Sequence, residues 1–218
     1  MRKKPLCFDL DETLIKSHEA HFLAFNLAFK KNGLKTVTRN KLIPLLNGQH
    51  AEQIIKKLFP NLLYTKIKRV REDHHNFIAK KTWRYARAIK GTKQALCKLQ
   101  KHYKLAIVTN CTHREINALL KGAGISKKFF AAIIGKEDVK RSKPFPDEIF
   151  KVEKLLHLQA AYHIGDSVYD IIAAKKAHVK AIAVLTGVAS RKELQKENPD
   201  LIIQSITKLP KILISKKD

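Results

Sequence analysis

The stretch CFDLDETL, residues 7 to 14, places two carboxylates, Asp9 and Asp11, two residues apart after a short apolar run. A second acidic pair, Asp166 and Asp170, follows another apolar run in the stretch HIGDSVYD. Taken alone, such acids are also typical of turns and helix caps. Carboxylates that meet repel one another, and a divalent cation between them removes most of that cost. Oxygen ligands without His or Cys at metal spacing indicate Mg²⁺.

The elements that must position these acids follow from the apolar pattern. Strand-like runs lie at 6–10, 103–110, 129–135, 160–166 and 179–187, with helical patterns at 92–102, 113–122, 146–157 and 167–177. This alternation predicts an α/β fold, a doubly wound parallel sheet covered on both faces. Ligands bind such sheets at the carboxyl ends of the strands, and the acids lie at those ends.

The segment 16–84 does not show this alternation of strands and helices, because its apolar residues have helical spacing and no convincing strand occurs in it. We expect a small α-helical domain inserted after the first strand. The remaining segments, 1–15 and 85–218, would form the α/β core domain.

The composition is unusual only in its charge. The 218 residues carry 44 Lys and Arg against 19 Asp and Glu, a formal net charge of +25. The excess is spread along the chain, and the aromatic residues do not alternate with the basic ones as a nucleic-acid stacking platform requires. A solvated basic surface is therefore favoured over a nucleic-acid site, and a field that attracts small anions remains an alternative.

Neither a membrane anchor nor a disulfide framework is indicated. The basic start of the chain is followed by only three consecutive apolar residues before Asp9, too few for a signal peptide or a membrane span, so we expect a cytoplasmic protein. Cys7, Cys97 and Cys111 are odd in number and form no CxxC pair, so we expect reduced, mostly apolar side chains.

Four short motifs, DLDETL, VTN, KPFPD and GDSVYD, occur in the order found in the haloacid dehalogenase-like (HAD) hydrolase superfamily, which the whole chain resembles. The insertion at 16–84 resembles the cap of the branch that contains phosphoglycolate phosphatases and β-phosphoglucomutases. The resemblance implies a Rossmann-like core and a Mg²⁺-dependent phosphatase of small phosphorylated anionic metabolites, most like phosphoglycolate phosphatase.

The resemblance also implies roles for the acids. Asp9 would be the nucleophile that forms an aspartyl-phosphate, and Asp11 the general acid and then the general base. Asp9, Asp11 and Asp166 would hold Mg²⁺. An acid at position 11 favours phosphate chemistry over carbon–halogen cleavage.

The other motif residues would bind the phosphoryl group. Thr109 and Asn110 would contact its oxygens, and Lys143 would neutralise both the nucleophile and the transferring group. Pro144 and Pro146 fix the backbone beside Lys143, just before an expected helix at 147.

Further residues would support the site from behind or from the cap. Thr13 would pack or hydrogen-bond behind the first loop, and Asp170 would assist or orient the groups in front of it. In the cap, Ser17 resembles a hinge residue and His21 a substrate-side histidine, although a surface role for His21 is an alternative. The stretch 46–50, LNGQH, resembles a substrate-specificity loop.

Several positions depart from the patterns of this branch. Glu12 and His178 replace residues that are usually Gly, and Ala51 stands where the mutases would have an Arg, which disfavours a mutase. Lys16 stands where an Asp is common, and we expect it near the entrance of the site, where it would favour an anionic substrate.

Two alternatives remain open. One is another enzyme of the same fold, a mutase or a nucleotide or pyrophosphate phosphatase. The other is a basic nucleic-acid-binding protein that keeps the fold without catalysis, although clustered acids speak against it. Neither the physiological substrate nor the oligomeric state can be inferred from the spacing of residues.

Overall fold

The computed structural model describes residues 3–214, and its centre is a parallel six-stranded sheet in the order β5-β4-β1-β6-β7-β8. The strands are β1 Pro5–Phe8, β4 Lys104–Val108, β5 Phe130–Ile134, β6 Tyr162–Gly165, β7 Lys180–Val184 and β8 Leu201–Ile203. The predicted α/β fold with a doubly wound parallel sheet is therefore confirmed.

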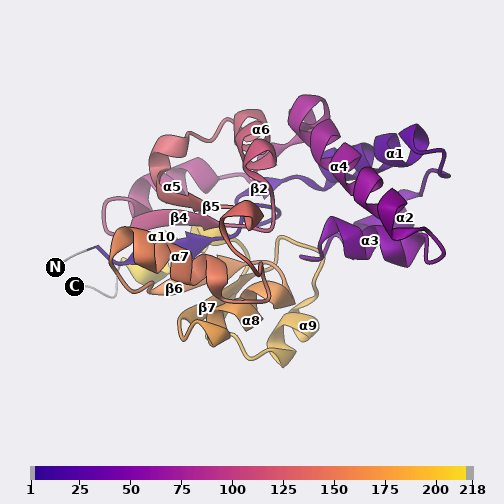
Figure 1. Cartoon of the computed structure of the whole chain (residues 1–218). Helices are drawn as coiled ribbons and strands as arrows, with labels where there is room; N and C mark the ends of the chain where they lie inside the picture. The colour runs from indigo at the N-terminus through magenta and orange to yellow at the C-terminus, as the bar shows by residue number, and fades with distance from the viewer. Residues whose placement is uncertain (1–2, 215–218) are drawn as a thin grey trace.

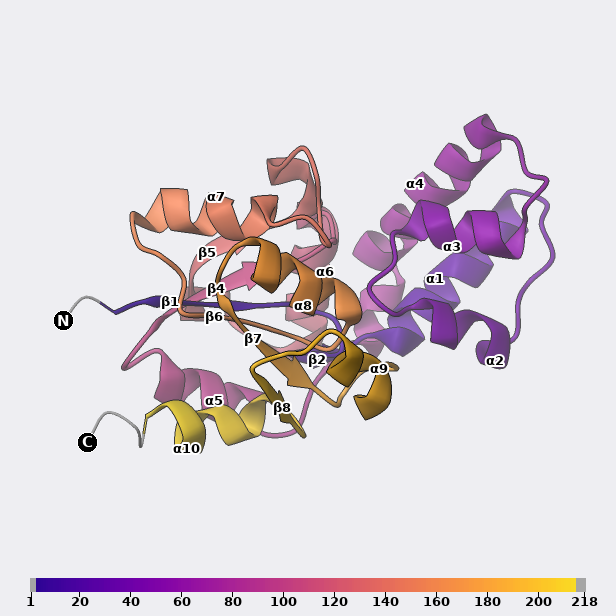
Figure 2. The same cartoon turned by 90° about the horizontal axis from the view of Figure 1, so that it is seen from below.

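Helices cover both faces of this sheet. They are α5 Thr92–Leu99, α6 His113–Ala123, α7 Asp147–Leu156, α8 Val168–Lys176, α9 Arg191–Lys196 and α10 Leu209–Leu213. Figure 2 shows α7 on one side of the strands and α5 with α10 on the other. Side chains alternate between these two layers: Leu6 and Phe8 of β1 pack in the cluster of α5, α6 and α10, whereas Cys7 packs with α7, α8 and α9.

A second group of helices comes from the chain between the first strand and α5. It comprises α1 His18–Lys31, α2 Arg39–Leu42, α3 Ala51–Leu58 and α4 Tyr64–Lys80, which lie beyond one end of the sheet (Figure 1). These helices have their own apolar core, which includes Phe25, Phe29 and Ile55. We refer to these four helices and their connections as the cap; its boundary at 16–84 stays a prediction.

Short elements complete the described chain. An antiparallel pair, β2 Ile15–Lys16 and β3 Arg87–Ala88, joins the cap to the sheet domain. The 3₁₀ turns are Ile43–Leu45, Thr82–Tyr85, Lys127–Phe129, Lys136–Asp138 and Ile206–Lys208. The sequence analysis missed β8, α9 and α10, because three strand residues and helices of five or six residues give too little periodicity.

The strand order reverses beside β1, which lies between β4 and β6. Such a reversal opens a crevice at the carboxyl ends of the neighbouring strands, where ligands bind. In this chain those ends are followed by Asp9, Thr109 and Asp166. The topology therefore gathers residues that are far apart in the sequence.

Glu12 and His178, which replace the usual glycines, both have positive φ angles, 51° and 56°. Only glycine adopts this left-handed conformation without steric cost. Both residues thus adopt a backbone conformation that suits glycine.

Two smaller expectations need adjustment. Cys7 and Cys111 are buried as expected, but Cys97 is exposed. Lys16 is exposed on β2 and does not line the pocket described below, because alternate residues of a strand point to opposite sides. Within residues 3–214, no helix has the length and apolar character needed to cross a lipid bilayer.

Candidate active site

Lys143 forms the centre of the site at the carboxyl end of the sheet. Its buried Nζ lies 2.5 Å from Asp9 Oδ1 and 2.7 Å from Asp170 Oδ1. Burial alone would lower the pKa of Lys143, but Asp170 and Asp9 raise it above its usual value. Pro146 caps α7, as expected for the KPFPD motif. The ammonium is therefore a fixed positive charge beside Asp9.

Asp170 holds Lys143 and has no free oxygen. Its Oδ1 also lies 3.1 Å from His163 Nε2, while its Oδ2 accepts hydrogen bonds from the backbone N–H and the hydroxyl of Ser167. Burial would raise the pKa of Asp170, but Lys143 holds it below its usual value. A Cβ on Gly165 would lie 2.1 Å from Asp170 Cγ, so the carboxylate needs a glycine at that position. These contacts suit the supporting role expected for Asp170.

Asp9 and Asp166 are buried carboxylates whose ionised forms are not fully stabilised by the surrounding groups. Burial raises the pKa of Asp9 to about 7 although Lys143 lowers it. Burial also raises the pKa of Asp166 well above its usual value, and the charge of Asp9 adds to this. Asp166 Oδ1 accepts a hydrogen bond from Thr13 Oγ1 at 3.1 Å, so Thr13 contacts the acidic group, and its supporting role stays a prediction. Two buried carboxylates of this kind form an oxygen donor set that fits Mg²⁺.

Asp11 points elsewhere. Carboxylate oxygens of Asp9, Asp166 and Asp170 gather within 4.8 Å of one another, whereas Asp11 groups with His21 and Cys111. Its Oδ1 lies 3.3 Å from His21 Nε2, and its Oδ2 accepts a hydrogen bond from Cys111 Sγ at 2.9 Å. The side chain placement thus does not support the expectation that Asp11 is a carboxylate ligand of the metal. The same contact brings His21 of the cap to the core, and its substrate-side role stays a prediction.

A pocket lies between the cap and the carboxyl end of the sheet, and Asp9, Asp11 and Lys143 line it. Thr109 and Asn110 lie where β4 ends and line this pocket as well. The side chain of Thr109 is buried. Asn110 Nδ2 donates to the carbonyl oxygens of Gly48, at 3.2 Å, and Lys143, at 3.3 Å. Because Gly48 belongs to the predicted specificity loop, Asn110 joins the cap to the core. A Cβ on Gly48 would lie 2.7 Å from Ser167 Oγ, which shows how closely this loop approaches the core.

Ser17 is fully buried just before α1 and lines the pocket. Its backbone N–H and that of His18 donate to Glu12 Oε1 at 2.7 and 3.0 Å. Glu12 therefore satisfies two N–H groups at the start of α1, and a carboxylate at a helix N-terminus is favourable. These hydrogen bonds stabilise the fold and offset part of the steric cost of a glutamate in a backbone conformation that suits glycine.

The sequence analysis missed a second set of polar residues, which lies where the cap meets the core in the pocket. His74 and His75 of α4 are buried, and Glu115 of α6 is buried opposite them. His75 Nδ1 lies 2.7 Å from Glu115 Oε1, and Lys136 Nζ lies 3.0 Å from His75 Nε2. His74 Nε2 lies 3.3 Å from His21 Nδ1. The adjacent histidines in an otherwise basic helix were the available signal, but only the fold brings Glu115 and Lys136 to them.

Comparisons with known proteins agree with this geometry. The chain is 29% identical over 213 residues to Pyrophosphatase PpaX from Oceanobacillus iheyensis, a match that covers 94% of both chains. A solved structure described as a predicted phosphoglycolate phosphatase from Haemophilus somnus has TM-score 0.83 and 24% identity over 97% of this chain and 98% of that one. A haloacid dehalogenase-like family hydrolase from Streptococcus pneumoniae has TM-score 0.82 and 22% identity over 99% of both.

The sequence model of one protein family, the haloacid dehalogenase-like hydrolases, matches residues 6–184 of this chain. This region includes the four motifs and the residues of the site. The resemblance seen in the sequence is confirmed, and the chain belongs to the haloacid dehalogenase-like hydrolase family.

Proposed function

We propose that this protein is a Mg²⁺-dependent phosphatase that hydrolyses a small phosphorylated metabolite through an aspartyl-phosphate on Asp9. The observation that carries the proposal is the buried group formed by Lys143, Asp9 and Asp166. A carboxylate beside a fixed ammonium can attack phosphorus, and a covalent intermediate divides one difficult hydrolysis into two easier steps. The relatives named as pyrophosphatases support phosphate chemistry.

Asp9 and Asp166 would hold the Mg²⁺, since their buried oxygens fit a hard cation. When bound, Mg²⁺ would neutralise charge on the phosphoryl oxygens and the nucleophile. Lys143, together with the metal, would favour the ionised form of Asp9, and Lys143 would stabilise charge on the transferring group. Thr109 and Asn110 would orient the phosphoryl oxygens by hydrogen bonds.

Asp11 would act first as the general acid and then as the general base of the reaction. Burial alone would raise the pKa of Asp11, but His21 holds it below its usual value, while Asp11 in turn raises the pKa of His21. The proton for the first step would therefore be held between Asp11 and His21 and would pass through the Asp11 carboxyl group to the leaving oxygen. In the second step the Asp11 carboxylate would take a proton from the attacking water. His21 and Cys111 would orient it, and the closed cap would exclude bulk water from the intermediate.

A second candidate reaction is the hydrolysis of pyrophosphate. The observation that favours it is the similarity, over nearly the full length, to proteins named pyrophosphatase PpaX. The same groups would act, with phosphate in place of an alkoxide as the leaving group. A mutase is disfavoured by Ala51, and a non-catalytic nucleic-acid-binding role is disfavoured by membership of a hydrolase family.

The test is phosphate release from a panel that contains 2-phosphoglycolate, sugar phosphates, nucleotides and pyrophosphate, with and without Mg²⁺. We expect turnover that requires Mg²⁺ and is lost in Asp9→Asn, and the preferred compound would identify the substrate class. Absence of release from every compound by the folded, Mg²⁺-loaded protein would refute the phosphatase proposal.

A further inference from the structure

Lys136 is a cation of the pocket that the proposed phosphoryl transfer does not use. It lies just after β5, on the core side, and lines the same pocket as Asp9 and Lys143. Within residues 3–214 it forms no ion pair with an acid, and its polar contact is to His75. Lys143, in contrast, contacts two carboxylates. The charge of Lys136 is thus available to a ligand.

The contacts of His75 fix the direction of this ammonium group. Lys136 has only N–H donors, so it donates to His75 Nε2 across 3.0 Å. The other ring nitrogen, Nδ1, then carries a proton and donates to Glu115 Oε1 across 2.7 Å. Glu115 is held in turn by Thr112, whose N–H and hydroxyl both donate to Glu115 Oε2 at 2.8 Å. A lysine has three N–H donors, so two remain for a molecule in the pocket.

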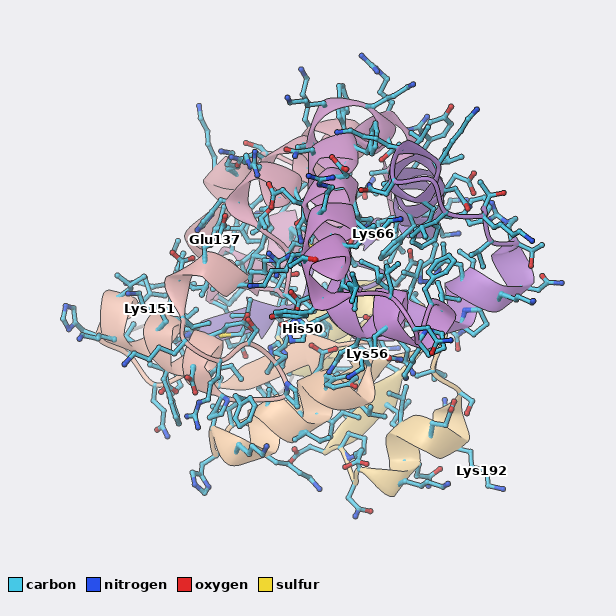
Figure 3. All side chains as sticks on the ribbon, turned by 45° about the vertical axis from the view of Figure 1, so that its right-hand side comes forward. His50, Lys56, Lys66, Glu137, Lys151 and Lys192 are labelled. Carbon is cyan, nitrogen blue, oxygen red and sulfur yellow. The ribbon has the colours of Figure 1, made fainter. Side chains whose placement is uncertain are left out.

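Lys136 and the phosphoryl end of the pocket are close enough for one small molecule, because Lys136 and His50 line the same pocket as Asp9 and Lys143. Burial together with the charges of Lys136 and Lys143 lowers the pKa of the His50 imidazole. His50 lies where the cap meets the core (Figure 3) and belongs to the specificity loop predicted at 46–50. The space beside this ring therefore has a cation on two sides.

We propose that Lys136, oriented by His75 and Glu115, binds a second anionic group on the substrate, a carboxylate or phosphate carried by the leaving group. This inference rests on the proposed function, since it takes Asp9 and Lys143 as the phosphoryl end. The preferred substrates are then small molecules with two anions, one at each end of a short spacer. Lys136 is the residue that selects them, and His75 is a positioning residue.

The test is calorimetric binding to the full chain with Mg²⁺ present, using two phosphonates of similar shape. Phosphonoacetate has a carboxylate at its far end, and isobutylphosphonate has two methyl groups in its place. We expect wild type to bind phosphonoacetate more tightly, and Lys136→Met to weaken that binding about 10- to 100-fold, the usual effect of a charged hydrogen bond. Binding of isobutylphosphonate should stay within about twofold.

Three variants complete the experiment. Lys136→Arg keeps the charge and should retain part of the preference for phosphonoacetate. Lys192→Met removes an exposed charge on α9 (Figure 3), and it should bind both ligands as wild type does. Lys136→Gln, which keeps a donor towards His75, replaces Lys136→Met if the latter does not fold.

Equal affinity of wild type for the two phosphonates would overturn the proposal. So would an equal loss for both ligands in Lys136→Met, because Lys136 would then only maintain the pocket. Failure of the proposed function is seen separately, as absent phosphate release while phosphonoacetate still binds through Lys136. Absence of binding by both phosphonates would overturn the proposal for Lys136, while the proposed function is decided separately by phosphate release.

Discussion

The two walls of the pocket are built differently. On the core wall, Lys143 and Asp170 are buried, and each charged atom is matched by an opposite charge or a donor. On the cap wall, His21 contacts Asp11 of the core and His74 of the cap. His75 contacts Glu115 and Lys136 of the core. Lys143 and Asp170 thus form a closed network, whereas Lys136, which meets the cap wall at His75, keeps N–H donors for a ligand.

From this difference we expect the core wall to carry out phosphoryl transfer and the side that faces the cap to select the substrate. A closed network holds a nucleophile and its counter-charge in one geometry, which phosphoryl transfer requires. The spare N–H donors of Lys136, beside the cap, can meet a variable part of the substrate. We therefore expect core substitutions to abolish folding or turnover, and substitutions on the cap wall to change affinity and pH dependence.

The largest expected effect concerns Lys143. Lys143→Met leaves Asp9 and Asp170 as unpaired buried carboxylates, and breaking such an ion pair costs about 3–5 kcal/mol of unfolding free energy. Urea titration in the absence of Mg²⁺ measures it. The matched substitution Lys136→Met should cost less than about 1 kcal/mol, because Lys136 is only partly buried and has no carboxylate partner. Similar losses of unfolding free energy in the two variants would show that Lys143 is held no more tightly by its partners than Lys136.

The next effect concerns Asp11, which joins the two walls. Asp11→Asn should lower kcat about 10²- to 10⁴-fold, the usual contribution of a general acid and base, while stability changes little. Steady-state kinetics with the preferred substrate measures it. Glu197→Gln removes one carboxylate at the end of α9, away from the pocket, and serves as the control. An unchanged kcat in Asp11→Asn would contradict its proposed role.

A smaller effect concerns the contact between His75 and Glu115. Burial alone would raise the pKa of Glu115, but His75 holds it below its usual value. The ionised group therefore stabilises the fold fully above the unfolded-state pKa, about 4.3, and this stability is lost as the pH falls further. One such group contributes at most about 1.4 kcal/mol per pH unit.

Unfolding free energies of wild type and Glu115→Gln, measured from pH 7 to pH 3, test this contribution. The difference between the two curves should shrink as the pH falls below about 4.3, because only the wild type loses an ionised Glu115. A difference that stays constant over this range would show that the Glu115 carboxylate is not stabilised in the fold.

The smallest effect concerns His178, which lies outside both walls. A residue other than glycine in the left-handed region costs about 1–2 kcal/mol, and glycine costs about 0.5–1 kcal/mol in lost chain entropy. His178→Gly should therefore stabilise the protein by about 0.5 kcal/mol. Lys176→Gly, at the last residue of α8, should instead destabilise by about 1 kcal/mol. Destabilisation by His178→Gly would show that contacts of the imidazole stabilise the fold by more than the backbone strain at His178 costs.

The sequence predicted the core wall far better than the cap wall. Asp9 and Asp166 each follow an apolar strand, so the parallel sheet alone brings them together. The orientation of Asp11 could not be predicted, since it depends on Cys111 and His21, which come from other elements. The THRE stretch at 112–115 is a recognisable capping box, and Glu115 does cap α6. Its contact with His75, however, depends on how α4 packs on α6.

The central claim is that Asp9 carries the phosphoryl group. It is tested most directly by rapid acid quench of the wild type during turnover with Mg²⁺, followed by mass spectrometry of the peptide that contains Asp9. We predict a phosphorylated Asp9 that appears before phosphate is released and is absent in Asp9→Asn, which should also be inactive. Turnover without a phosphorylated Asp9, or phosphate release by Asp9→Asn at the wild-type rate, would contradict the claim.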